Sequence, residues 1–140
     1  MYKKIAFLGT PNFAVPILKS IHQGNYKISC VFSQPPRKSN RGHKLNKSPI
    51  HLLSEELGIE IKTPENIEKE IDYIKSLNLD LAIVVAYGQI LSKDILSLSK
   101  NGFINIHASL LPKWRGAAPI QRSLINMDKI TGLSLSLIHI

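Results

Sequence analysis

The sequence predicts an α/β protein with an open, mostly parallel twisted sheet that carries helices on both faces. Short apolar runs alternate with segments of helical periodicity, a pattern that builds a parallel sheet with right-handed crossovers. The chain has 140 residues, of which 44% are hydrophobic, so it can bury one core but is too short for two domains. One apolar run ends in two polar side chains, and sheets of this class bind ligands at the carboxyl ends of their strands.

Six segments have the short length and the apolar or alternating pattern of strands. The most apolar segment predicts a fully buried strand and is broken by Tyr87 and Gly88. The shortest segment is expected at a sheet edge, and the last one alternates apolar and polar residues. The predicted strands cover residues 3–8, 27–33, 60–62, 81–86, 102–107 and 133–140.

Five segments carry the spacing or the end signals of helices. The first follows the turn that starts at Gly9 and ends before Gly24, and the second has Ser48 as its N-cap and Pro49 at the first helical position. The third is charged, exposed and amphipathic, and the last follows small residues that permit close packing. The predicted helices cover residues 13–22, 48–57, 68–77, 93–98 and 119–125.

The net charge of +8 is concentrated in the first third of the chain. Within it, residues 34–48 predict a long basic loop, because their Pro, Asn and Gly residues disfavour both helix and strand. Two interpretations remain open: contact with a polyanion such as an RNA backbone, or a solvated loop without a partner, since no aromatic residue offers a stacking platform. The cations of the loop are Arg37, Lys38, Arg41, Lys44 and Lys47.

Several classes of protein and site are disfavoured by the sequence. No segment resembles a signal peptide or the roughly 20 apolar residues of a membrane span, so we expect a cytoplasmic protein. The turn after the first strand has one glycine, Gly9, where a dinucleotide-binding motif needs three, which argues against a nicotinamide or flavin cofactor. The histidines lack the spacing of a zinc site, and the single cysteine, Cys30, is expected in the core.

Asn105 and His107 are the candidate catalytic residues. Their spacing places both on one face of a strand, and Phe103 is expected to point the other way. The amide donates hydrogen bonds and the imidazole exchanges protons near neutral pH, which suits formyl or acyl transfer through a tetrahedral carbon with a developing oxyanion. The alternative interpretation is structural, with Asn105 capping a turn and His107 hydrogen-bonded in place.

Five motifs extend over nearly the whole chain. They are Phe-Leu-Gly-Thr-Pro at residues 7–11, Val-Ala-Tyr-Gly at 85–88, Asn-Ile-His at 105–107, Ser-Leu-Leu-Pro at 109–112 and Trp-Arg-Gly-Ala-Ala-Pro-Ile-Gln at 114–121. Together they resemble the amino-terminal catalytic domain of the methionyl-tRNA formyltransferases. The third and fourth motifs are shared by the wider group of enzymes that use 10-formyltetrahydrofolate, whereas the last motif and the basic loop favour the members that act on tRNA.

This resemblance implies a Rossmann-like formyltransferase domain that moves a formyl group from 10-formyltetrahydrofolate to the amino group of methionyl-initiator tRNA, for translation initiation. Asn105 and His107 would stabilise the tetrahedral intermediate, and no metal would be required. The basic loop, with Arg37, Lys38, Arg41, Lys44 and Lys47, would approach the acceptor stem of the tRNA, and full-length members are expected to be monomers. The tetrahydrofolate would be held by Ser109, Leu110, Leu111 and Pro112, together with Ala86, Tyr87, Gly88 and Leu91.

The chain also departs from the family pattern. The family's third catalytic residue, an Asp in a Leu-Asp-Ala/Thr-Gly turn, is expected after the last predicted strand, but the sequence ends a few residues earlier, at Ile140. We therefore expect residues 1–140 to be a partial catalytic domain that lacks the family's carboxyl-terminal tRNA-binding β-barrel domain. We expect it to be inactive alone, because the imidazole would lack the carboxylate that sets its tautomer and pKa. His139 has no chemistry that replaces a carboxylate.

Two other functions remain open. One is a formyltransferase that acts on a small amine, such as an amino sugar or glycinamide ribonucleotide, and this function would not depend on the basic loop. The other is a non-catalytic remnant that binds folate or RNA. The role of Trp114 is equally open, because a single Trp either stacks on RNA or substrate or covers the edge of the core.

Overall fold

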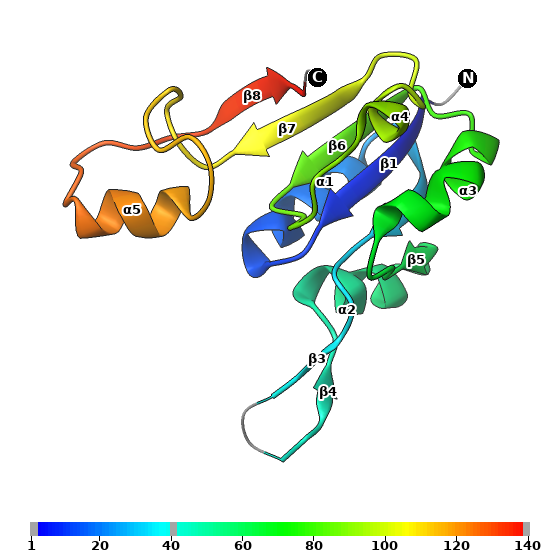
Figure 1. The fold of residues 1–140 in the computed structure, drawn as a ribbon, viewed down its shortest axis with the longest axis horizontal. Helices are drawn as coiled ribbons and strands as arrows, with labels where there is room; N and C mark the ends of the chain where they lie inside the picture. The colour runs from blue at the N-terminus through cyan, green and yellow to red at the C-terminus, as the bar shows by residue number, and fades with distance from the viewer. Residues whose placement is uncertain (1–2, 40–41, 139–140) are drawn as a thin grey trace.

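A computed structural model describes residues 3–39 and 42–138 and contains a six-stranded, mostly parallel sheet (Figure 1). The strand order is β5, β2, β1, β6, β7, β8, and every neighbouring pair is parallel except β7 and β8. The order reverses between β1 and β6, and such a reversal opens a crevice at the carboxyl ends of the strands. The strands are β1 (Lys3–Gly9), β2 (Tyr26–Phe32), β5 (Ile61–Lys62), β6 (Leu81–Val85), β7 (Phe103–His107) and β8 (Ser134–Leu137).

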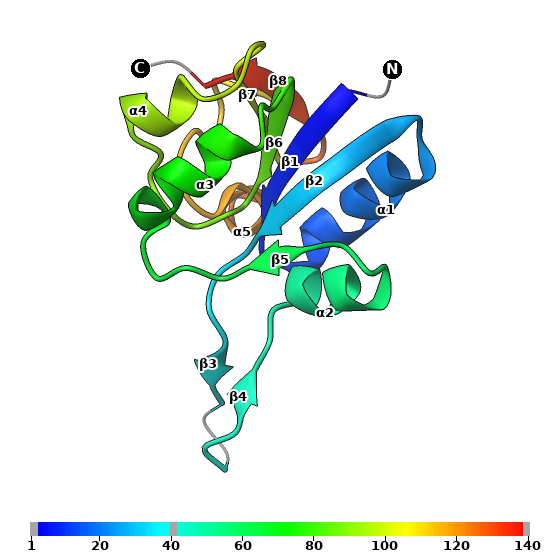
Figure 2. The same ribbon diagram turned by 90° about the vertical axis from the view of Figure 1, so that its right-hand side faces the viewer.

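Helices cover both faces of the sheet, as the sequence predicts (Figure 2). α1 and α2 pack on one face, and α3 and α4 pack on the other. α5 lies apart from both layers, near the carboxyl end of β7 (Figure 1). The helices are α1 (Val15–Gln23), α2 (Pro49–Glu56), α3 (Ile71–Ser76), α4 (Lys93–Leu96) and α5 (Pro119–Ile125), and the 3₁₀ turns η1 (Asn12–Ala14) and η2 (Ile67–Glu70) precede α1 and α3.

Two apolar clusters hold these layers together. On β1, Phe7 belongs to the cluster that includes Leu18 of α1, whereas Leu8 belongs to the cluster that includes Ile74 of α3. Cys30 is fully buried in the second cluster, as predicted, and desolvation raises the pKa of its thiol to about 11. Alternating residues of the central strands therefore pack against helices on opposite faces.

The predicted strands and helices agree with the structure to within a few residues at each end. The third predicted helix begins with the η2 turn, and the last predicted strand appears as β8, with residues 139–140 outside the described part of the chain. No helix in residues 3–39 or 42–138 combines the length and apolar character needed to cross a membrane.

The basic loop is more regular than predicted. β3 (Arg37–Lys38) and β4 (Leu45–Asn46) form a two-residue antiparallel ladder, which continues with a hydrogen bond of 3.1 Å from the Ser39 N–H to the Lys44 carbonyl. The prediction that this segment avoids strand is wrong here because its prolines precede the ladder and leave the paired N–H groups intact. The hairpin projects from the body of the sheet (Figures 1 and 2).

One predicted orientation on β7 is also wrong. Phe103 lies on the same face as Asn105 and His107, because residues two apart in a strand share a face, and it is buried in one cluster with Val84 of β6. Ile106 points to the opposite face, toward the cluster that includes α1. Asn105 and His107 thus lie on the same face of β7 as Phe103, whose side chain is buried in the core.

Gly9 ends β1 at the position where a dinucleotide-binding loop would begin. A Cβ atom at this residue would lie 2.8 Å from Cε1 of Phe7 and 3.0 Å from the carbonyl oxygen of Val85. The missing side chain therefore lets the ends of β1 and β6 approach each other. Close packing of two strands accounts for this glycine.

We predict that Gly9→Ala lowers the free energy of unfolding by about 1–3 kcal/mol, because the added methyl group must displace the backbone of β6. Urea unfolding followed by circular dichroism measures this change. Gly24→Ala is the matched control: its new Cβ would lie 3.0 Å from the ring of Tyr26, which is 51% exposed and can move aside, so we expect a change within about 0.5 kcal/mol. Equal losses in the two variants would contradict the packing role of Gly9.

Candidate functional site

The candidate site lies where β6 and β7 end. Val84 is paired with Asn105 in the parallel ladder, so the segments that follow the two strands leave the sheet at the same edge. They enclose a cavity of about 600 Å³, which we call the central cavity. Its walls include Asn105 and His107 of β7, residues 86–89 after β6, and residues 116–121 before and within α5.

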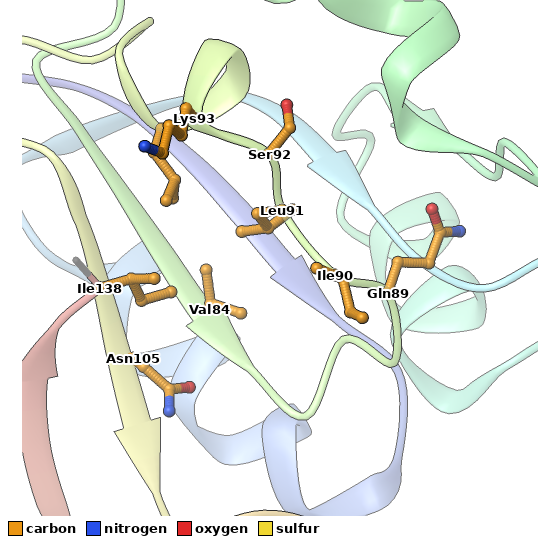
Figure 3. Close-up of a pocket in the computed structure, with 9 residues that line it drawn as sticks. Val84, Gln89, Ile90, Leu91, Ser92, Lys93, Asn105 and Ile138 are labelled. Carbon is orange, nitrogen blue, oxygen red and sulfur yellow. The ribbon is translucent and has the colours of Figure 1, made fainter. Parts of the chain in front are cut away.

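A second cavity of about 570 Å³, the side cavity, adjoins the first. Residues 89–93 form one side of it, and Val84 and Ile138 lie on the other (Figure 3). Val84, Gln89 and Asn105 line both cavities. Asn105 therefore lies on a wall that the two cavities share.

The Asn105 side chain is available to a ligand. It is half-buried, and in the described part of the chain its amide has no hydrogen-bond partner. Figure 3 shows the amide at the end of β7, beside Val84 on β6. Such an amide can donate a hydrogen bond to an oxygen atom placed in either cavity.

His107 is held by the backbone of the loop that follows it. Its Nε2 lies 3.0 Å from the carbonyl oxygen of Trp114. Because a carbonyl only accepts, this hydrogen bond requires a proton on Nε2, and Nδ1 of the neutral ring is then an acceptor. Among the described residues no carboxylate contacts the ring, and no group of three or more His, Cys, Asp and Glu side chains is placed to share a metal ion.

The loop at residues 86–88 is fixed by its neighbours on both sides. Ala86 and Gly88 have φ values of 49° and 91°, in the left-handed region. The Tyr87 carbonyl accepts hydrogen bonds from Thr10 Oγ1 at 2.9 Å and from Gln34 Nε2 at 3.2 Å. The Tyr87 ring is buried in the core, where desolvation raises the pKa of its hydroxyl above the usual range. This loop thus offers mainly backbone groups to the central cavity.

The bend at residues 109–112 turns away from both cavities. The Ser134 hydroxyl of β8 donates to the Ser109 carbonyl at 2.7 Å and accepts from the Leu111 N–H at 3.0 Å. Polar contacts hold this bend against β8, and residues 109–112 are not among those that line the central or the side cavity. The structure therefore does not bring residues 109–112 together with residues 86–91.

The basic hairpin, formed by β3 and β4, carries predicted cations of which one borders a cavity next to the site. Arg37, Lys38, Lys44 and Lys47 are exposed, and Arg41 lies outside the described residues. Lys47 Nζ is 2.6 Å from Glu55 Oε1, and this contact lowers the pKa of the Glu55 carboxyl. Arg37 lines a third cavity of about 320 Å³, which residues 86–88 also line. The base of the hairpin is therefore continuous with the loop beside the central cavity.

Asp128, which was not among the predicted site residues, organises the loop next to His107. Its carboxylate accepts hydrogen bonds from Lys113 Nζ at 2.7 Å, Trp114 Nε1 at 2.6 Å and Asn126 Nδ2 at 2.7 Å. These donors, Lys113 first among them, hold the pKa of the Asp128 carboxyl well below its usual range. One signal was available in the sequence: Asp128 is the only acidic residue after Asp94.

We predict that Ser134→Ala releases the bend from β8. The variant removes both hydrogen bonds to the bend, so the free energy of unfolding should fall by about 1–2 kcal/mol, and hydrogen exchange at the Leu111 amide, measured by NMR, should become faster. Ser136→Ala is the matched control on the same strand, since the Ser136 hydroxyl has no hydrogen-bond partner in residues 3–39 or 42–138. Unchanged exchange at Leu111 in Ser134→Ala would contradict the role of this contact.

Known proteins resemble the chain in sequence. It matches the formyl transferase family over residues 3–139. It is 60% identical over 138 residues to the methionyl-tRNA formyltransferase of Pelagibacter ubique, an alignment that covers 96% of this chain and 44% of that protein. Over 134 residues it is 49% identical to the methionyl-tRNA formyltransferase of Caulobacter vibrioides, covering 94% of this chain and 44% of that protein. The chain thus spans about 44% of the length of these curated relatives.

Solved structures share the fold at low sequence identity. The phosphoribosylglycinamide formyltransferase of Bacillus halodurans is 15% identical, with a TM-score of 0.75 over 98% of this chain and 72% of that chain. A formyltetrahydrofolate deformylase of Pseudomonas syringae is 18% identical, with a TM-score of 0.73 over 99% of this chain and 47% of that chain. From the match over residues 3–139, this chain belongs to the formyl transferase family.

Proposed function

We propose that this chain forms a catalytic domain that moves a formyl group from 10-formyltetrahydrofolate to the amino group of methionine on initiator tRNA. The observation that carries the proposal is the position of Asn105, next to His107 and on the wall that two cavities share. Two adjoining cavities leave room for a formyl donor and an amine acceptor. The formyl group would pass from one to the other beside the residues that line both cavities. The 60% identical relative named methionyl-tRNA formyltransferase supports this choice of substrates.

The folate is assigned to the side cavity. Val84, Leu91 and Ile138 line this cavity with apolar side chains, and such walls suit a flat pterin ring, with nearby backbone groups to orient it. In this arrangement Leu91 and the backbone of residues 86–88 are the predicted folate contacts that border the cavities. Residues 109–112 would support the folate indirectly. They hold β8 in place, and Ile138, which follows β8, lines the side cavity.

The transfer uses the two substrates and two side chains. The amine attacks the formyl carbon, a C–N bond forms, and the carbonyl oxygen becomes an oxyanion that the Asn105 amide stabilises. His107 accepts the proton of the amine at Nδ1. It returns a proton to N10 of the folate as the bond from N10 to the formyl carbon breaks, which leaves tetrahydrofolate and the formylated amine.

We expect the chain alone to be inactive. Among the described residues no carboxylate contacts His107, so no such partner stabilises the imidazolium that forms when Nδ1 takes a proton. Assays should therefore compare the chain with a chimera that adds the remaining part of the Pelagibacter ubique relative, of which this chain covers 44%.

The basic hairpin is assigned to the acceptor end of the tRNA. Arg37, Lys38 and Lys44 are exposed on a segment that projects from the sheet (Figure 2), whereas Lys47 is engaged with Glu55. Cations on a projecting hairpin can contact phosphates while the esterified amino acid reaches the central cavity. We assign Arg41 the same contact with tRNA phosphates because it lies in the same segment of the sequence.

Asn105→Ala and His107→Ala in the chimera are each expected to lower kcat by about 10²–10³-fold, because each removes a group that acts on the transition state. Formyl transfer from 10-formyltetrahydrofolate to charged initiator tRNA measures the effect. Lys19→Ala, at an exposed position of α1, is the control and should leave kcat unchanged. A chimera that binds folate without any turnover would instead support the non-catalytic remnant.

Replacing Arg37 and Lys44 by Ala is expected to raise KM for tRNA and to reduce the slope of log affinity against log salt by about one per lost phosphate contact. The double variant Lys19→Ala and Lys27→Ala removes the same charge from exposed positions away from the hairpin, and should have a smaller effect on both quantities. If the hairpin variant kept the original KM and salt slope while a small amine was formylated efficiently, the small-amine function would replace the tRNA assignment.

A further inference from the structure

We propose that Asp128 is a positioning residue for His107 and acts through Trp114: the carboxylate holds the indole, and the carbonyl of the same Trp holds Nε2 of the imidazole. This positioning is a property of the folded chain, and only its effect on turnover rests on the proposed function.

The Asp128 carboxylate joins two segments of the chain. Lys113 and Trp114 donate to it from the loop after β7, at 2.7 and 2.6 Å, and Asn126 donates from the end of α5, at 2.7 Å. The Asp128 N–H also donates to the Ser123 carbonyl of α5 at 3.0 Å. The Asp128 side chain is 7% exposed, whereas that of Lys113 is 53% exposed. The hydrogen bond from the indole is therefore the more sheltered one, and the charge of the carboxylate strengthens each of the three.

Trp114 links the carboxylate to the imidazole. Its φ of 57° lies in the left-handed region, which a residue other than glycine keeps only when its surroundings hold it there. Its indole N–H is bound to Asp128 at 2.6 Å, and its carbonyl lies 3.0 Å from His107 Nε2. Loss of the indole contact would free this backbone to relax and withdraw the carbonyl from His107.

Apolar burial does not provide the same anchor for α5. Ser123 is its buried residue, whereas Ile120, Leu124 and Ile125 are 42%, 72% and 82% exposed. The polar contacts of Asp128 therefore hold this segment, and residues 116–121 of the same segment line the central cavity.

The consequence at His107 is the choice of tautomer. When Nε2–H is donated to the Trp114 carbonyl, Nδ1 remains the proton acceptor that the proposed transfer requires. Without that carbonyl, the neutral ring exchanges between both tautomers and is free to rotate.

Nitrogen-15 NMR of the histidine-labelled chain measures the state of His107 without any assay of activity. The unchanged chain should show Nδ1 as an unprotonated nitrogen and Nε2 as a protonated one. Asp128→Ala and Trp114→Phe should each shift both signals toward an averaged position and speed the solvent exchange of the ring N–H. Asp128→Asn keeps an oxygen that can accept from the indole, so it should restore part of the original signals.

The controls separate positioning from general stability. Asp72→Ala removes an exposed acid on α3 and should leave the His107 signals unchanged. The double variant of Asp128→Ala and Trp114→Phe should shift the signals no further than either single variant, because the two residues act in series. If circular dichroism shows that Asp128→Ala is unfolded, Trp114→Phe decides the test. Unchanged His107 signals in the folded variants would overturn the proposal.

The chimera tests the catalytic consequence. Asp128→Ala should lower kcat about tenfold to a hundredfold by misplacing the imidazole, leave KM for the folate within about twofold, and be partly rescued by Asp128→Asn. An active chimera whose kcat is insensitive to Asp128→Ala would overturn the catalytic part of the proposal. If the His107 signals respond but no form of the chimera transfers formyl groups, the proposed function fails and the positioning role stands.

Discussion

The pairing of Val84 with Asn105 in the β6–β7 ladder positions the rest of the site. A slip of one residue would turn Asn105 and His107 toward the face covered by α1 and put Ile106 on the face that they now occupy. Buried apolar residues on both faces of β6 oppose such a slip, and Phe103 is fixed in the core two residues before Asn105. The hydrophobic pattern of the strands, rather than a contact of the polar pair itself, thus determines where the amide and the imidazole lie.

Features that depend on local signals could be predicted from the sequence. The strand at residues 81–85 follows from its apolar run, and α2 begins where predicted because Ser48 Oγ accepts from the His51 N–H at 3.0 Å. The direction of the bend at residues 109–112 could not be predicted in this way. Ser134 decides it from 25 residues further along the chain, and no periodic pattern connects those two segments.

The same distinction applies to the site. The placement of Asn105 and His107 beside one cavity could be predicted because residues two apart in a strand share a face, a rule that also corrects the expected orientation of Phe103. Asp128 was missed because its contact with Trp114 spans 14 residues and joins a loop to the end of a helix. Its isolation among basic residues was a signal of charge pairing, but charge alone does not name the partner.

The two walls of the central cavity are held by different forces. Residues 86–89 rest on the buried Tyr87 ring and on hydrogen bonds from neighbouring strand ends, whereas residues 116–121 depend on the contacts of Asp128 with Lys113, Trp114 and Asn126. Since the folded pKa of Asp128 is lowered, its contribution to stability is fully present above the unfolded value of about 4 and is lost as pH falls through the folded value. The second wall therefore stays fixed throughout the neutral range, and acid weakens it before it weakens the packed wall.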